Sequence, residues 1–168
     1  MISQLRTLAS SMMGSLVMIA VALFFVLVTP TEELEAPPLW LLGAQVAAGV
    51  VVHLLVESVG YRARAIPPGT TETEARRLAG AAFTTGTVLR FALCESIAFA
   101  SVAAAFLVES GGYAGYLTGA AVSLLLMAVH AWPGEGPVGK TQTSLERDGA
   151  RSYLREQLGL GIGPIQEL

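Results

Sequence analysis

The sequence contains little charge and almost no cysteine. Only 14% of its 168 residues are Asp, Glu, Lys or Arg, whereas 53% are hydrophobic. The single cysteine, Cys94, excludes an internal disulfide, and no spacing of Cys and His matches a metal site. The sequence therefore predicts neither a bound metal nor another cofactor. Such a composition is typical of a multi-pass membrane protein and unusual for a soluble domain.

Several long segments lack charge altogether. No Asp, Glu, Lys or Arg lies between Arg6 and Glu32, between Glu35 and Glu57, or between Glu109 and Glu135. A fourth apolar stretch, residues 91–108, is interrupted only by Glu95. Each stretch accommodates a helix of about 20 residues, which crosses a hydrocarbon core of about 30 Å. We therefore predict an all-α fold, a membrane four-helix bundle with spans near 10–28, 39–58, 91–108 and 112–131.

The basic residues are confined to one side of this map. Apart from Arg6, they lie in the loop 59–90 and in the C-terminal tail: Arg62, Arg64, Arg76, Arg77, Arg90, Lys140, Arg147, Arg151 and Arg155. Short basic loops stay in the cytoplasm, so both termini are predicted to be cytoplasmic. The excess of Arg over Lys, with abundant Ala, Gly and Val, is typical of GC-rich bacteria. We therefore expect a bacterial inner membrane protein that contacts anionic lipid, and no binding of nucleic acid.

The segments outside the membrane are short. Thr71 and Glu74 fit a capping box, which predicts a helix that begins there and runs towards the third span, loosened at Gly80 and Gly86. We assign residues 1–135 to the bundle and 136–168 to an amphipathic cytoplasmic tail. Within this tail the four-residue spacing of its arginines predicts a helix over 143–158. Neither segment is long enough to bury a core of its own, so we expect no soluble domain.

Small residues recur at helical spacing in two spans. These rows are Gly111, Gly115, Gly119 and Ser123 in the fourth span, and Ser96, Ala100 and Ala104 in the third. Rows of small residues let two backbones approach closely inside a membrane. The connector around 109–112 is so short that these two spans form an antiparallel hairpin, which favours packing within the chain. Self-association through the same rows is the alternative.

Polar residues inside the spans are the candidates for function. Gln45, Gly49, His53 and Glu57 recur every four residues and form one row on the second span. A polar row facing lipid is costly, so it should face the bundle interior or a neighbouring subunit. Glu95 begins the third span five residues after Arg90, and His130 ends the fourth span on the same side. Our candidate intramembrane site comprises Glu95, His53, Glu57 and Arg90.

Two resemblances involve the third span. Residues 88–108 resemble the carboxylate-bearing helix of rotary ATP synthase c subunits, which implies that Glu95 exchanges a proton. The chain departs from that family because it has four spans and no Arg-Gln-Pro polar loop. As a whole it resembles small four-span bacterial inner-membrane proteins of unassigned function, which begin the third span with Arg-x-Ala-Leu-x-Glu, here Arg90-Phe-Ala-Leu-Cys-Glu95. That resemblance implies an architecture and no reaction.

Three functions fit these observations. Serines within the spans have no nearby base, so we expect no enzyme and no catalytic residue. The favoured function is that of a non-enzymatic accessory, assembly or interaction subunit, which binds another membrane protein or a second copy of itself. The first alternative is proton- or ion-coupled translocation through Glu95, His53 and Glu57. The second is a b-type haem held between His53 and His130.

Overall fold

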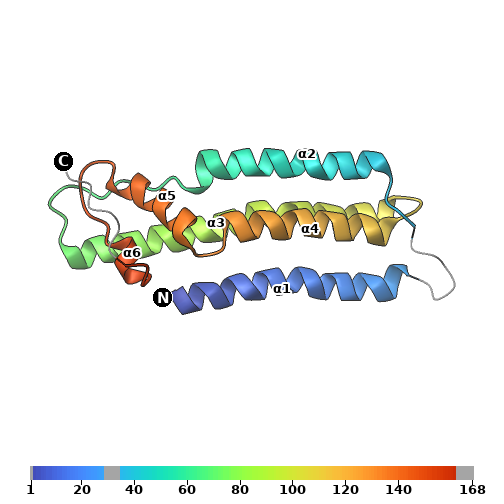
Figure 1. Ribbon diagram of the computed structural model, residues 1–168, viewed down its shortest axis with the longest axis horizontal. Helices are drawn as coiled ribbons and strands as arrows, with labels where there is room; N and C mark the ends of the chain where they lie inside the picture. Colours follow the sequence, from blue (N-terminus) through green and yellow to red (C-terminus); the bar gives the residue numbers. More distant parts are fainter. Residues whose placement is uncertain (1, 29–34, 162–168) are drawn as a thin grey trace.

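The chain folds into helices joined by short loops. The computed structural model describes residues 2–28 and 35–161, and these residues contain no strand. The elements are α1 (Ile2–Leu27), α2 (Leu39–Leu55), the π-helical turn η1 (Val56–Gly60), α3 (Glu72–Leu107), α4 (Gly112–His130), α5 (Glu135–Glu146) and α6 (Leu154–Gln157) (Figure 1).

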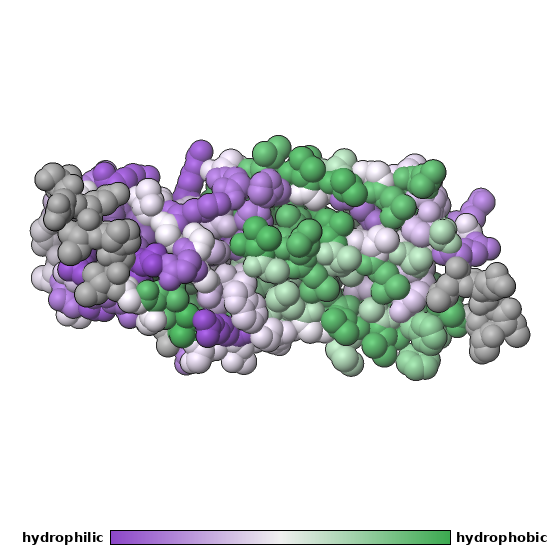
Figure 2. Space-filling model, viewed as in Figure 1, coloured by the Kyte–Doolittle hydropathy of each residue, from purple (hydrophilic) through white to green (hydrophobic). Residues whose placement is uncertain are grey.

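The predicted membrane bundle is confirmed. The four helical segments 2–27, 39–60, 72–107 and 112–130 are long and apolar enough to cross a membrane. The helices α3 and α4 form the central pair, and α1 and α2 flank this pair on opposite sides (Figure 1). The helix α1 begins, and α4 ends, at the end of the bundle where α5 and α6 lie, here called the terminal end. Figure 2 shows a hydrophobic surface along the middle of the bundle and hydrophilic surface over the terminal end.

The glycine row of α4 lies against neighbouring helices of the same chain. A Cβ on Gly119 would lie 1.9 Å from Ser101 Oγ of α3, and one on Gly115 would lie 2.8 Å from Leu41 of α2. At the next position Ser123 Oγ donates a 2.7 Å hydrogen bond to the carbonyl of Cys94 in α3. The small residues therefore let α4 approach both α2 and α3 closely.

The small-residue row predicted on α3 does not pack within the chain. Ser96 and Ala100 are exposed, and Ala104 is half-buried. The buried face of α3 instead runs through Cys94, Ala98, Ser101 and Ala105. This face contains the same kinds of small residue, and the contacts with α4 decide which of the two rows is buried.

A polar cluster ties three helices together in the middle of the bundle. Gln45 Nε2 of α2 donates to the carbonyl oxygen of Gly115 at 2.7 Å and to Ser101 Oγ at 3.0 Å. Thr118 Oγ1 of α4 donates to Gln45 Oε1 at 2.6 Å. Because Gln45 is buried, these bonds satisfy an amide that would otherwise be costly within a membrane.

The third span is one part of a longer helix. The 36 residues of α3 run without a break from Glu72 to Leu107, about 54 Å at 1.5 Å per residue. The helix starts where we predicted, but the capping box does not form: Thr71 makes no side-chain capping bond, and Glu74 pairs with Arg77. Neither Gly80 nor Gly86 loosens the helix, which is continuous through both residues. Gly86 instead makes room for Arg90, since a Cβ there would lie only 3.1 Å from a guanidinium nitrogen of Arg90.

The tail after residue 135 packs against the end of the bundle. The first turns of α3 and the chain from Tyr61 to Thr71 pack with α5 and α6 into a compact unit, here called the terminal module. Its buried core consists of Leu5, Ile66, Ala75, Ala79, Phe83, Val138, Leu145, Leu154 and Leu158. Each segment is too short for a core by itself, but α1, the loop before α3, α3, α5 and α6 combine to form one.

The amphipathic helix predicted over 143–158 is also absent. Instead α5 ends at Glu146, Gly149 adopts a φ of +87°, and α6 begins at Leu154. The positive φ favours glycine and reverses the chain, so that Leu154 and Leu158 reach the core of the terminal module. Pro137 does not break the chain, because it lies in the first turn of α5, where its missing N–H has no partner to lose.

Backbone and side-chain hydrogen bonds hold the terminal module on α3. Ile66 N donates to Leu145 O at 2.9 Å, which joins the loop before α3 to α5. Gln157 Nε2 of α6 donates to the carbonyl oxygen of Arg76 at 3.0 Å, and Arg76 pairs with Glu156 at the same distance. The terminal module is thus fixed to the bundle through the helix that they share.

Candidate functional site

The polar row of α2 faces α4 along its whole length. Gln45 bonds to Gly115, a Cβ on Gly49 would lie 2.9 Å from Val122, and His53 contacts His130. His53 Nδ1 and His130 Nε2 lie 2.8 Å apart, within hydrogen-bond distance. The prediction that this row points into the bundle therefore holds for Gln45 and Gly49, which are buried, whereas His53 and Glu57 are exposed at its edge.

The π-helical turn η1 carries the acidic member of the site. In this turn Glu57 comes one helical turn after His53, and its carboxylate forms an ion pair with Lys140 of α5. The same oxygen, Oε1, lies 3.7 Å from His130 Nδ1. Single π turns inside α-helices are rare and frequently occur at functional sites.

Tyr61 orients the second histidine. Its hydroxyl lies 2.8 Å from His130 Nδ1, on the opposite edge of the imidazole ring from His53. Burial raises the pKa of the Tyr61 phenol to about 12, so the phenol keeps its proton at neutral pH. The simplest assignment is that Tyr61 donates to Nδ1, and His130 Nε2–H then donates to Nδ1 of His53. His130 is only 1% exposed, and this chain satisfies both of its nitrogens.

Arg90 supports the turn from the other side. Its guanidinium is fully buried and donates to the carbonyl of Gly60, the last residue of η1, at 2.8 Å, and to Thr87 Oγ1 at 2.9 Å. The guanidinium carbon lies 4.8 Å from the centre of the Tyr61 ring, a cation–π contact. Among the described residues no carboxylate pairs with Arg90.

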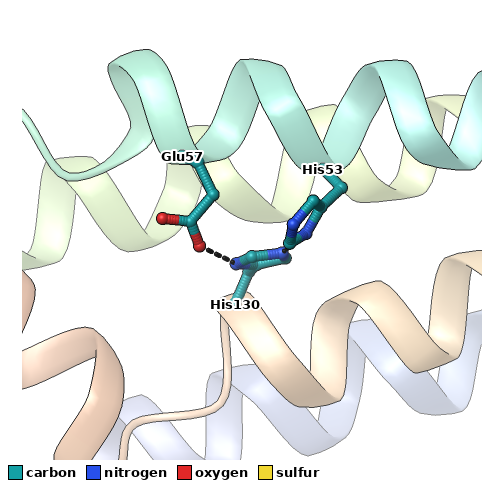
Figure 3. A group of neighbouring side chains, drawn as sticks. All are labelled: His53, Glu57 and His130. Atoms are coloured by element: carbon teal, nitrogen blue, oxygen red, sulfur yellow. Dashed lines mark hydrogen bonds and ion pairs between the residues drawn. The ribbon is translucent and has the colours of Figure 1, made fainter.

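The side chains of His53, Glu57 and His130 lie together, with Glu57 and His53 at opposite ends of the His130 ring (Figure 3). One potential ligand atom from each of His53, Glu57 and His130 lies within 4.8 Å of the other two. His53 and Glu57 are on the outer side of the cluster, and His130 is buried. An apolar groove of about 330 Å³ between α2 and α4 reaches His53. The arrangement can bind a proton or a cation between groups from three elements.

The structure separates the predicted site residues into two groups. His53 and Glu57 lie together, and Arg90 reaches them only through Tyr61 and Gly60. Glu95 lies elsewhere, half-buried next to Ser15 of α1. Among the contacts of the described residues, Glu95 therefore pairs with neither Arg90 nor His53. Tyr61 and Lys140, which our sequence analysis did not include, belong to the site.

The comparisons with known proteins give no relative. No protein family, curated protein or solved structure matched the chain. No homologue therefore supports the resemblance of residues 88–108 to ATP synthase c subunits, or that of the whole chain to small four-span proteins. The fold and the site together define a multi-pass, all-α membrane protein with a His–Glu–His cluster at one end of its bundle.

Proposed function

We propose that this chain is a non-enzymatic membrane protein that acts by contact, as an accessory, assembly or interaction subunit in a bacterial inner membrane. The single observation that carries the proposal is the continuity of α3, which holds the terminal module rigidly on the four-helix bundle. A folded module in a fixed position at a membrane surface is suited to docking another protein. The polar groups inside the bundle support this proposal, because Gln45, Thr118 and Ser123 are used in joining helices.

The charges of the terminal module suit the cytoplasmic face. Arg62 and Arg64 are exposed where η1 leads into the module, and no acid of the described residues pairs with either. Exposed arginines next to a membrane attract anionic lipid headgroups. Their position agrees with a topology in which both termini are cytoplasmic.

The topology has a direct test with single cysteines. In a Cys94→Ala background, Thr73→Cys places a thiol on the exposed start of α3, and Ser110→Cys places one in the exposed loop before α4. We expect a membrane-impermeant maleimide to label only Ser110→Cys in intact cells, and both variants after the cells are permeabilised. Labelling of Thr73→Cys in intact cells would reverse the proposed orientation.

The contact function predicts protein neighbours in the membrane. A photoreactive phenylalanine analogue in place of Phe25 on α1, Val50 on α2 or Phe106 on α3 samples three exposed faces of the bundle. We expect at least one of these positions to give a protein adduct of defined mass in living cells, and the same partner to co-purify in mild detergent. The analogue at Phe91, which is fully buried, is the matched control and should give none.

Adducts with lipid alone at all three faces, together with a monomeric chain in detergent, would contradict the proposal.

The two alternative functions, proton- or ion-coupled translocation and haem binding, have no comparable observation in their support. Glu95 does not lie with His53 and Glu57, which weakens a shared translocation site. The imidazoles of His53 and His130 bond directly to each other, with ring centroids 4.9 Å apart, which leaves no space for a haem between them.

A further inference from the structure

We propose that His53, Glu57 and His130 bind a divalent transition-metal ion, with Zn²⁺ as the best fit. This site is independent of the contact function proposed above. Two imidazoles and one carboxylate are a common ligand set for such ions, and three protein ligands leave a fourth position to water. The ligands come from α2, η1 and the last residue of α4, so an ion would join the two helices at the terminal end (Figure 3).

The distances are within reach of a shared ion. In tetrahedral coordination at about 2.05 Å, two nitrogen ligands lie roughly 3.3 Å apart. His53 Nδ1 and His130 Nε2 are 2.8 Å apart, so the histidines would separate by about 0.5 Å. Glu57 Oε1 lies 3.7 Å from Nδ1, on the other edge of the His130 ring, so its carboxylate would swing to the Nε2 edge. Glu57 can make this movement because its side chain is 35% exposed.

The surroundings already contain the support that a metal-bound histidine needs. A ligating imidazole almost always donates its other N–H to a fixed acceptor, which sets its tautomer and orientation. If His130 binds the ion through Nε2, its Nδ1–H faces the Tyr61 hydroxyl oxygen at 2.8 Å. Tyr61 is in turn held under the guanidinium of Arg90. The orientation of His130 is thus fixed by residues that do not themselves bind the ion.

Lys140 competes with a metal ion for the carboxylate of Glu57. Its ammonium pairs with the carboxylate of Glu57 and lies 4.8 Å from the centre of the Tyr61 ring. Metal binding must displace this ammonium from Glu57 and shift the proton of His130 from Nε2 to Nδ1, where the Tyr61 hydroxyl, turned to accept it, lies 2.8 Å away. Lys140 is 47% exposed and has room to leave, and it lies on α5. Binding of the ion would therefore also free α5 from its ion pair with η1.

No sequence motif predicts this site. Zinc motifs are recognised from closely spaced ligands, whereas His53 and His130 are 77 residues apart. Only the pair His53 and Glu57 has the helical spacing of a shared ligand face. The π-helical turn that begins at Val56 further changes where Glu57 points, and it has no pattern in the sequence.

The test is titration of the EDTA-treated full chain with CoCl₂ in detergent, after purification through a tag without histidine. We expect one Co²⁺ per chain with the strong visible bands of tetrahedral coordination, displacement by ZnCl₂, and no competition from MgCl₂. His53→Ala and His130→Ala should each weaken binding by at least about a hundredfold, and Tyr61→Phe by about tenfold. Glu72→Gln, which changes an exposed acid of α3, is the control and should bind as the parent does.

The Lys140→Met variant distinguishes binding of Co²⁺ at this site from adventitious binding of Co²⁺ to a histidine elsewhere. Because the ammonium competes with the ion for Glu57, its removal should tighten Co²⁺ binding about tenfold, whereas Glu57→Gln should weaken it. Circular dichroism of each variant establishes that the bundle is intact. If the buried His130→Ala variant does not fold, the affinity of the His53→Ala variant decides, because His53 is exposed. Absence of Co²⁺ binding by the parent, unchanged affinity in His53→Ala, or weaker binding in Lys140→Met would overturn the proposal.

Discussion

Gly119→Ala is expected to destabilise the bundle by about 3 kcal/mol, although it adds a single methyl group. That methyl carbon would lie 1.9 Å from Ser101 Oγ, 2.6 Å from Ser101 Cβ and 3.0 Å from Gln45 Nε2. Neither α3 nor α4 has space to accept it. The two helices must move apart, and the hydrogen bonds of Gln45 to Ser101 and Gly115 are strained or lost together.

The measurement is unfolding by SDS in mixed micelles, followed by the loss of helical circular dichroism. Gly43→Ala is the matched control: it lies in α2, and nothing is within 4 Å of the position of its Cβ. There the added methyl should be neutral or stabilise the helix by up to about 1 kcal/mol, because alanine loses less backbone entropy than glycine. Equal stability of the Gly119 and Gly43 variants would show that α3 and α4 do not touch at this point.

Arg90→Ala is expected to cost about 3–5 kcal/mol, the other large effect. Arg90 is among the largest fully buried side chains, and its removal leaves a cavity between Tyr61 and Phe83 and an unpaired carbonyl at Gly60. Arg90→Met fills most of the same volume and also removes a buried cation that has no acidic partner among the described residues. Such a replacement is tolerated better than truncation, so it should cost at least about 2 kcal/mol less than alanine.

The same SDS titration decides between packing and charge at this position. Arg77→Ala is the control, since Arg77 is exposed and pairs only with Glu74, and it should change the stability by less than about 0.5 kcal/mol. If Arg90→Met were as unstable as Arg90→Ala, the hydrogen bond to Gly60 and not the volume would hold this end of the bundle. In that case η1 should also lose its π-helical turn, which would displace Glu57.

Much of the bundle was predictable from charge alone. The gaps without charge located the spans, because a membrane helix cannot leave ionised side chains in hydrocarbon. The row from Gln45 to Glu57 was predicted to face inward, since polar groups at four-residue spacing share one face. This holds for Gln45 and Gly49, whereas His53 and Glu57 are exposed. The connector around Gly111 indicated the α3–α4 hairpin, and Gly119 was predicted to lie at a helix contact.

The terminal module and half of the site could not be predicted in this way. The core of the module joins Leu5, Ile66 and Leu158, which belong to segments that are each unremarkable by themselves. Tyr61 and Lys140 reach the histidines only because η1 ends at Gly60 and α5 folds back on it. Both features depend on tertiary contacts that periodicity does not record. For the same reason, we predicted the row Ser96, Ala100 and Ala104 on α3, whereas the structure buries the face with Ala98, Ser101 and Ala105.

The composition of the core of the terminal module has a consequence for biosynthesis. This core includes Leu5, near the start of the chain, and Leu154 and Leu158, close to its end. A growing chain therefore inserts its spans before the residues that complete this core have left the ribosome. The first turns of α3 must wait, with Ala79 and Phe83 uncovered, until Leu158 has left the ribosome. In that interval the helices are inserted while the module is still open.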